Sequence, residues 1–233
     1  MLLLLVCWTI LSGHCISATK YTCDPKLACG CTSSSTSVGA RIVGGELAAN
    51  RAWGWMISLR RSNSHVCGAS LLTSQYAITA GHCVRNDLNN PSRLSIVVGT
   101  NYLNDASSAT YQRRTVTNII LHPNYNFDLV TNDIAILQFA PLKTSGNSSL
   151  AFVCLPSANQ DPFRVNSNLV ATGWGYTYEG SGSVTNSLRQ LTVQAYPSAS
   201  INCLQSGLKD SNAQFCAGNI AGGKGKHSLH PFV

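Results

Sequence analysis

Short apolar or alternating runs, separated by turn residues, fill the chain from Ile42 onward and constrain its fold more than any other feature. The runs are WMISLR, ASLLTS, YAITA, RLSIVVGT, TVTNIILH, DIAILQFA, NLVATGWG and LRQLTVQAY. Runs of this length, recurring at this spacing, are typical of the strands of a sandwich or barrel. Helical periodicity is nearly absent, apart from a short turn predicted at SASINCLQ with Ser198 or Ser200 as its cap. The pattern therefore predicts an all-β, antiparallel fold.

The amino-terminal stretch MLLLLVCWTILSGHCIS has the features of a secretory signal peptide. An apolar run from Leu2 to Leu11 precedes small residues at Cys15 and Ser17, which suit cleavage after Ser17. The run is too short to span a bilayer. A buried helix is the alternative, but no cap or amphipathic period accompanies the run. We expect residues 1–17 to be a signal peptide and the mature protein to be secreted, extracellular and without a membrane partner.

The cysteine content agrees with an oxidising compartment. Removal of the signal peptide removes Cys7 and Cys15 from the 10 cysteines and leaves an even number, as disulfide pairing requires. The remaining cysteines are Cys23, Cys29, Cys31, Cys67, Cys83, Cys154, Cys203 and Cys216. A zinc site at Cys29 and Cys31 is the alternative, but the CGC spacing matches no common zinc finger, so we expect no metal. The sequence NSS at Asn147 is a glycosylation acceptor typical of secreted proteins.

Between the signal peptide and Arg41, the chain is first Cys-rich and then rich in Ser, Thr and Gly. This composition predicts a disulfide-stapled stub followed by a flexible, exposed stretch that proteases cut easily. The net charge is +7, but the basic residues are scattered, with only the pairs Arg60–Arg61 and Arg113–Arg114 adjacent. No nucleic-acid motif accompanies them, so we expect a generally basic surface and no nucleic-acid partner.

Two short motifs within the β pattern carry residues suited to acid–base chemistry. TAGHC places His82 directly after an apolar run, and NDIAIL places Asp133 at the start of another. A buried carboxylate is costly unless it accepts hydrogen bonds, and an imidazole that donates one keeps its other nitrogen free to act as a general base. Each residue also has a structural alternative: a histidine beside a disulfide, and an aspartate in a turn that enters a strand.

The order of motifs resembles that of the trypsin and chymotrypsin family of serine endopeptidases. The matching segments are RIVGG, CGASLL, TAGHC, HPNYN, NDIAIL, CLP, GWG and FCAG. The resemblance covers most of the chain and implies two six-stranded antiparallel barrels with the active site in the cleft between them. It implies His82 as general base and Asp133 as the residue that orients it, without any cofactor. Substrates would be proteins or peptides.

The resemblance also implies partners for the cysteines. Cys67–Cys83 and Cys203–Cys216 would match bridges of the family, and Cys154 is similar to the residue that tethers a propeptide cysteine. Cys29 is the better candidate for that tether, which leaves Cys23 to pair with Cys31, although sequence alone does not fix connectivity.

RIVGG resembles the activation site of the family. Cleavage after Arg41 would free the ammonium group of Ile42, which in relatives pairs with an aspartate next to the nucleophilic serine. An arginine at this position implies activation by a trypsin-like protease. The expected organisation is a signal peptide over residues 1–17, a propeptide over 18–41 and a protease domain over 42–233.

The match to the family pattern stops after GGK, at Lys224. The segment GDSGGP, which supplies the nucleophile and the oxyanion-hole donors, is absent. In an ungapped alignment Gly225 occupies the base of the specificity pocket, His230 the activation aspartate and Pro231 the nucleophile. Ser228 lies in KHSLH, without the glycine neighbours of a tight turn. We expect an inactive product with an incomplete second barrel, whose tail comes from a frameshift, a retained intron or an alternative last exon.

Two other functions compete with an endopeptidase. A noncatalytic homologue would act as a binding or decoy protein that engages a partner such as a protease inhibitor. A disulfide-rich matrix protein would explain the secretion signal and the cysteines, but it would leave the ordered motifs RIVGG, TAGHC and NDIAIL unexplained.

Overall fold

The computed structural model describes residues 19–22, 24, 26–31, 36–39, 45–145, 150–158, 164–177, 182–205, 207–210 and 214–218 of the chain. Strands dominate these residues, and all the strand pairs are antiparallel. The predicted all-β, antiparallel fold is therefore confirmed. No described helix is long and apolar enough to cross a membrane.

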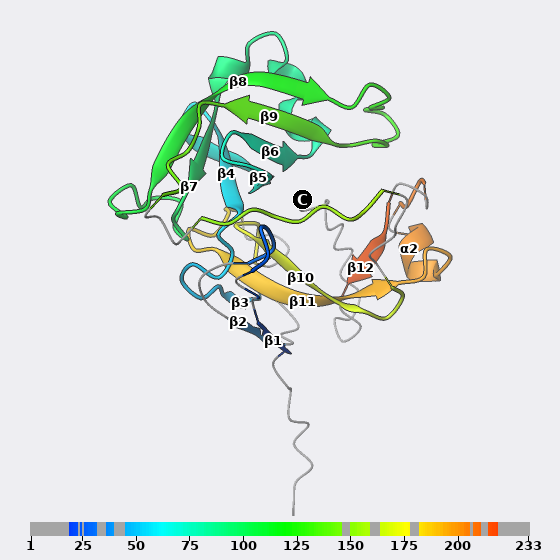
Figure 1. The fold of residues 1–233 in the computed structure, drawn as a ribbon. Helices are drawn as coiled ribbons and strands as arrows, with labels where there is room; N and C mark the ends of the chain where they lie inside the picture. The colour runs from blue at the N-terminus through cyan, green and yellow to red at the C-terminus, as the bar shows by residue number, and fades with distance from the viewer. Residues whose placement is uncertain are drawn as a thin grey trace, which may run out of the picture.

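Six strands form a closed barrel in the order β4-β5-β6-β9-β8-β7 (Figure 1). Their bounds are β4 Met56–Arg61, β5 Ser64–Leu71, β6 Tyr76–Thr79, β7 Leu94–Val98, β8 Gln112–Leu121 and β9 Ala135–Phe139. Closure leaves no strand edge unpaired within this unit. The short helical elements α1 (Gly81–Val84), η1 (Arg85–Asp87) and η2 (Pro91–Arg93) lie between β6 and β7.

Local sequence explains how the barrel begins. Arg61 of β4 pairs with Ser64 of β5 across a two-residue turn. Ser62 and Asn63 in that turn have φ values of 48° and 72°. Positive φ at both positions is what a type I′ turn requires, and the twist of that turn matches the twist of antiparallel strands.

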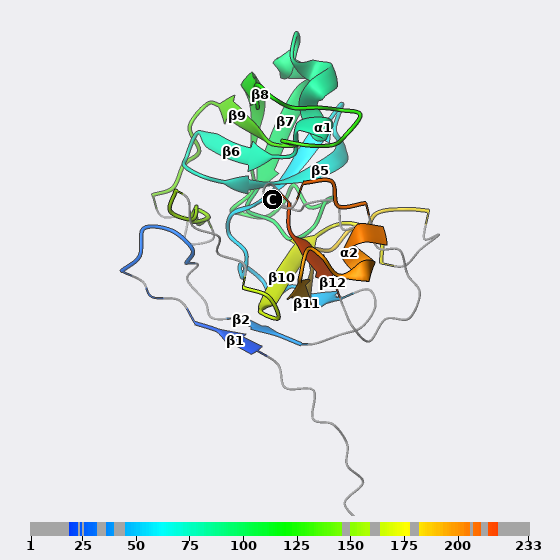
Figure 2. The ribbon, with the colours of Figure 1, turned by 90° about the vertical axis from the view of Figure 1, so that its right-hand side faces the viewer.

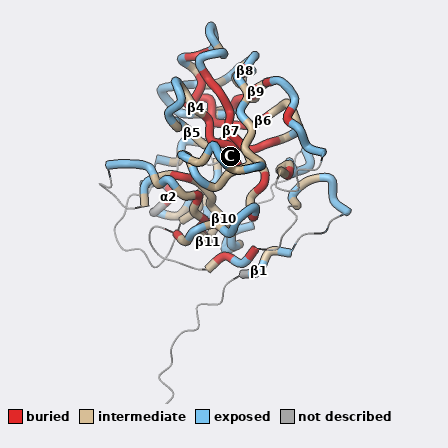
Figure 3. Tube along the Cα trace, turned by 90° about the vertical axis from the view of Figure 1, so that its left-hand side faces the viewer, coloured by how far each residue is buried: buried red, intermediate tan, exposed pale blue. Residues whose placement is uncertain are grey.

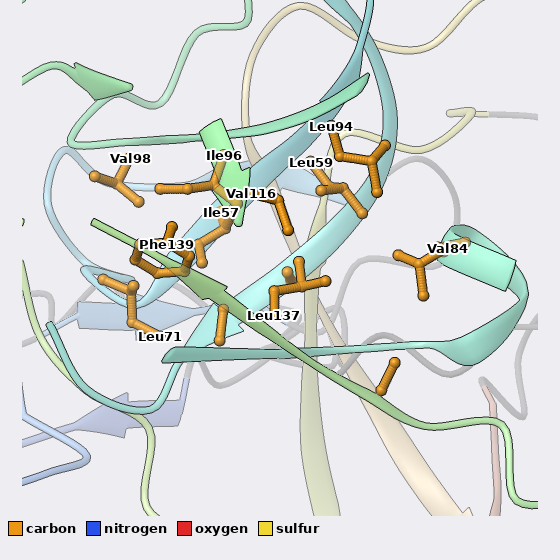
Figure 4. Packing of buried hydrophobic residues seen from close by; sticks show 14 of the residues in the cluster. Ile57, Leu59, Leu71, Val84, Leu94, Ile96, Val98, Val116, Leu137 and Phe139 are labelled. Atoms are coloured by element: carbon orange, nitrogen blue, oxygen red, sulfur yellow. The ribbon is translucent and has the colours of Figure 1, made fainter. Parts of the chain in front are cut away.

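The barrel interior holds the main hydrophobic core. In β9 the buried and partly buried positions alternate, whereas β7 is buried throughout, so both strands direct apolar side chains inward. Ile57, Leu59 and Leu137 are inaccessible to solvent and meet near the centre of the barrel (Figure 4). The concentration of buried residues in the barrel strands is visible along the chain (Figure 3). This rigid core fixes the loops that leave each end of the barrel.

A second sheet contains β10 (Asn168–Gly173), β11 (Arg189–Tyr196) and β12 (Cys216–Gly218), with β3 (Glu46–Leu47) also paired to β11. Among the described residues this sheet has four strands and does not close into a barrel. The short helix α2 (Ile201–Gln205) falls within the segment predicted as a helical turn. A hairpin of β1 (Thr19–Tyr21) and β2 (Thr36–Val38) lies below the sheet, on the side away from the barrel (Figure 2).

Part of the segment that precedes Arg41 is not the exposed stretch that its composition predicts. Thr36 and Val38 are buried in β2, which pairs with β1. The amide N–H of Gly39 donates to Oε1 of Glu46 over 2.7 Å. The buried Val38 side chain and the hydrogen bond from Gly39 to the Glu46 side chain therefore hold this part of the segment against the body of the protein.

Candidate active site

The pairing of β6 with β9 brings His82 and Asp133 together, although 51 residues separate them. Thr79, the last residue of β6, pairs with Ala135, the first residue of β9. Because these strands are antiparallel, the chain leaves β6 into α1 at the same end of the barrel from which Asp133 leads into β9. Strand register therefore positions the two side chains.

His82 and Asp133 form two hydrogen bonds. The Nδ1 atom of His82 lies 2.7 Å from Oδ2 of Asp133, and the backbone N–H of His82 donates to Oδ1 over the same distance. The Asp133 side chain is 6% exposed and the His82 side chain is 33% exposed. A buried carboxylate on Nδ1 favours the tautomer that carries its proton there and leaves the lone pair on Nε2. A pair of this form can serve as a general base with its orienting carboxylate.

Gly81 provides the space in which this pair fits. A Cβ atom at Gly81 would lie 2.7 Å from Cδ1 of Leu121, 3.2 Å from Oδ1 of Asp133 and 3.2 Å from Cδ2 of Tyr125. The first distance is too short for carbon atoms in contact, and the second involves the oxygen that receives the His82 backbone N–H. The glycine of TAGHC is therefore needed for the close approach of α1 to the Asp133 loop.

A disulfide between Cys67 and Cys83 fixes α1 to β5. Nε2 of His82 lies 3.4 Å from Sγ of Cys83. These two cysteines and His82 are close enough together to suggest a metal site. However, the two sulfur atoms are bonded to each other, so they do not provide the thiolates that zinc binds. We interpret the disulfide as a covalent link that holds the helix carrying His82 against β5.

The structure also contains the bridges Cys29–Cys154 and Cys203–Cys216, with the pairings that the resemblance implies. Cys31 is disulfide-bonded, and its expected partner Cys23 lies outside the described residues. Because Cys29 and Cys31 are both oxidised, CGC offers no zinc thiolates. The remaining predicted positions outside the described residues are Arg41, Ile42, Asn147, Gly225, Ser228, His230 and Pro231.

Several residues near the site carry contacts that the motifs did not indicate. The Arg85 guanidinium lies 3.2 Å above the ring centre of Phe127, which joins η1 to the loop that leads to Asp133. The buried carboxylate of Asp87 pairs with Arg61. The sequence contains no signal for this pair: Arg61 is one of two adjacent arginines, and no recognisable motif surrounds Asp87.

Comparisons with known proteins agree with this geometry. The family model described as Trypsin matches residues 42–227. Trypsin-1 of Astacus astacus is 37% identical over 161 residues, which are 69% of this chain and 65% of that protein, so the chain spans slightly less than two thirds of this relative. Trypsin of Phaedon cochleariae is 35% identical over 193 residues, 81% of this chain and 71% of that protein. The chain belongs to the trypsin family of serine proteases.

Proposed function

We propose that the protein is, by family, a secreted serine endopeptidase of the trypsin type, made as a zymogen, with His82 as general base and Asp133 as its orienting residue. We propose further that the 233-residue chain itself lacks the nucleophilic serine and the oxyanion hole and is inactive. The observation that supports the endopeptidase proposal best is the 2.7 Å contact from Nδ1 of His82 to Oδ2 of Asp133 in a chain of the trypsin family. These are the roles of the base and the carboxylate in the family's catalytic triad. The substrates are proteins or peptides.

In a complete enzyme of this family, which would also supply the nucleophilic serine, Nε2 of His82 would take the proton of the serine hydroxyl as the oxygen attacks a peptide carbonyl. The imidazole becomes positively charged, and the Asp133 carboxylate stabilises that charge through Nδ1–H. The proton then passes from Nε2 to the leaving amine. His82 would carry the proton and Asp133 would orient and stabilise the imidazole, and the reaction would need no cofactor.

We further propose that residues 1–17 are a signal peptide, that residues 18–41 are a propeptide and that a trypsin-like protease cuts after Arg41. The described part of the propeptide is held to the body by the Cys29–Cys154 disulfide. The disulfides also support an extracellular location.

A second candidate function is that of a noncatalytic binding or decoy protein. The observation that favours it is that the sequence contains no GDSGGP, and that Ser228 lies between His227 and Leu229 rather than beside glycines. The 233-residue chain by itself would then lack a nucleophile and remain inactive. Its partners would be proteins that recognise trypsin-like surfaces, such as protease inhibitors.

One experiment tests the proposed activation site and the proposed lack of a nucleophile. The purified protein is incubated with trypsin, its new amino terminus is sequenced, and a serine-directed phosphonate probe is then added. We expect an Ile42 terminus and no labelling of the 233-residue chain. Labelling would show that this chain has a reactive serine and is an enzyme by itself, and absence of the cut after Arg41 would refute the proposed activation site.

A chimera tests whether His82 and Asp133 are catalytically competent. Residues after Gly218 are replaced by the corresponding segment of the Astacus trypsin, and hydrolysis of fluorescent casein is measured after activation. The endopeptidase proposal predicts activity that His82→Ala abolishes and that Arg114→Ala preserves, because the Arg114 side chain bonds to Pro141 and Gln112 rather than to the site. A folded chimera without activity would favour the binding protein.

A further inference from the structure

A buried ion pair lies next to the helix that carries His82. Asp87 in η1 has a side chain that is 0% exposed, and Nε of Arg61 donates to its Oδ2 over 3.0 Å. Nη2 of Arg61 contacts the same oxygen. The other carboxylate oxygen lies 3.7 Å from Nε of Arg93, which is an ion-pair distance but too long for a hydrogen bond. Asp87 is thus held mainly by one arginine, through two nitrogen atoms.

The same guanidinium also reaches the backbone of α1. Nη2 of Arg61 donates to the carbonyl oxygen of Cys83 over 3.2 Å. Cys83 is the residue directly after His82, and Arg61 is the last residue of β4. Arg61 therefore connects a barrel strand to two consecutive segments that are distant from it in sequence: the carbonyl end of α1 and the buried carboxylate of η1.

This connection is important because α1 has little internal support. The helix has four residues, and its N-cap, Ala80, makes no side-chain cap hydrogen bond. The last carbonyl groups of a helix have no partner within it, so a short helix depends on donors from elsewhere. The guanidinium supplies one such donor, and its planar fork is fixed in turn by the Asp87 carboxylate.

We propose that Arg61 and Asp87 are positioning residues for His82: the ion pair holds the Cys83 carbonyl so that the imidazole of His82 faces Asp133. The inference rests on the proposed role of His82 as general base. Neither residue contacts the reacting atoms. The ion pair acts on His82 through the backbone that joins Cys83 to His82. Its effect is therefore measured on the His82 ring, as the fraction of the ring protonated at Nδ1.

The experiment is nuclear magnetic resonance of the 233-residue protein labelled with 15N-histidine, with the His82 signals assigned from a His82→Gln variant. Two quantities are read for His82: the fraction of the ring protonated at Nδ1, with its low-field proton, and the exchange rate of its backbone amide proton. The test variants are Arg61→Ala, Arg61→Lys and Asp87→Asn. Arg114→Ala is the matched control, because Arg114 also lies on a barrel strand but bonds to Pro141 and Gln112.

We expect Arg61→Ala to reduce the low-field signal at least twofold and to accelerate amide exchange about tenfold or more. Arg61→Lys should give an intermediate result, because one ammonium group cannot form the same fork. Asp87→Asn should change both quantities in the same direction, and Arg114→Ala should change neither. If Arg61→Ala does not fold, Arg61→Lys and Asp87→Asn decide the matter.

Folded Arg61 and Asp87 variants with unchanged His82 signals would overturn the inference, since the ion pair would then only stabilise the barrel. Failure of the proposed function would look different. In that case the wild-type protein would lack the low-field proton, and Asp133→Asn would leave the His82 ring unchanged.

Discussion

Asp133 accepts two hydrogen bonds from one residue, because both the backbone N–H and the imidazole of His82 donate to it. A carboxylate that is nearly buried is costly unless its oxygens have donors, and here each oxygen has one. The donors lie on a helix that begins right after β6. The polar pair therefore also fixes the helix relative to the loop that leads to Asp133.

The lack of space for a side chain at Gly81 gives a prediction for a single residue. Gly81→Ala should lower the free energy of unfolding by about 1–3 kcal/mol, because the new methyl group would overlap Leu121 and approach Oδ1 of Asp133. Urea denaturation measures this change. In the same variant, the His82 Nδ1 signal should weaken.

The matched control for that substitution is Gly68→Ala in β5. An added Cβ at Gly68 would meet nothing within 4 Å, and its φ is not in the positive region. We expect a change within about 0.5 kcal/mol, as for surface substitutions that disturb no contact. Equal destabilisation by the two substitutions would show that crowding at Gly81 is not the cause.

At the scale of elements, the apolar runs predicted most strands of the barrel but not their full lengths. The run ASLLTS marks only the end of β5, which begins at Ser64. The first half of β5 has exposed and partly buried side chains, so it carries no continuous apolar signal. The hairpin of β1 and β2 gave no signal either, since its strands have three residues each and are stabilised by distant contacts.

Gln190 of β11 is the centre of those distant contacts. Its Nε2 donates to the carbonyl oxygen of Ser37 over 3.0 Å and to Oε1 of Glu46 over 2.9 Å. Its Oε1 accepts from Nε1 of Trp53 over 2.8 Å. Glu46 accepts in turn from the amide of Gly39. One buried amide group thus joins β2 to the second sheet.

We predict that Gln190→Leu loosens the stretch from Thr36 to Gly39. The substitution removes the donor to Ser37 and leaves the Trp53 N–H without its partner, at a cost of about 1–3 kcal/mol. Hydrogen exchange measured by mass spectrometry should show faster exchange in a peptide that covers residues 36–39. Gln194→Leu on the same strand should leave that exchange unchanged, and equal protection in both variants would contradict the prediction.

The motifs identified His82 and Asp133 because each lies beside an apolar strand, yet they could not indicate how these residues are supported. Arg61 and Asp87 are 26 positions apart, and Gln190 is 153 positions from Ser37. Arg, Asp and Gln at the surface of a β protein are common, and only the folded chain shows which of them are buried together. Supporting residues of this kind depend on strand register, which local patterns do not fix.

On the scale of the whole molecule, the barrel and the second sheet meet at a junction around Trp174. Nε1 of Trp174 donates to the carbonyl oxygen of Asn101, and Met56 and Leu188 pack in the same small cluster. The ring of His65 in β5 lies edge-on to Trp174 at a centre-to-centre distance of 5.6 Å. The Oγ atom of Ser58 lies 2.9 Å from Nδ1 of His65.

His65 makes this junction sensitive to acid. Burial, together with the nearby positive charge of Arg60, lowers the pKa of His65 from its usual 6.5 to about 4. In the unfolded chain the imidazole takes up a proton near pH 6.5, whereas in the folded protein it does so only near pH 4. Between these values the unfolded state binds more protons, so stability falls as the pH decreases from 6.5 to 4.

Between pH 6.5 and pH 4 the free energy of unfolding should fall by about 1–3 kcal/mol less in His65→Asn than in the wild type. The range allows for the partial exposure of the ring. Asparagine can still accept a hydrogen bond from Ser58 but does not titrate between pH 4 and 7. Urea unfolding followed by tryptophan fluorescence, repeated across this pH range, measures the effect. His122→Asn is the control. His122 lies outside the junction, so His65 still becomes charged beside Arg60 and Trp174 on acidification, and the free energy of unfolding should depend on pH as in the wild type. A His65→Asn protein that loses as much stability as the wild type would place the acid-sensitive group elsewhere in the molecule.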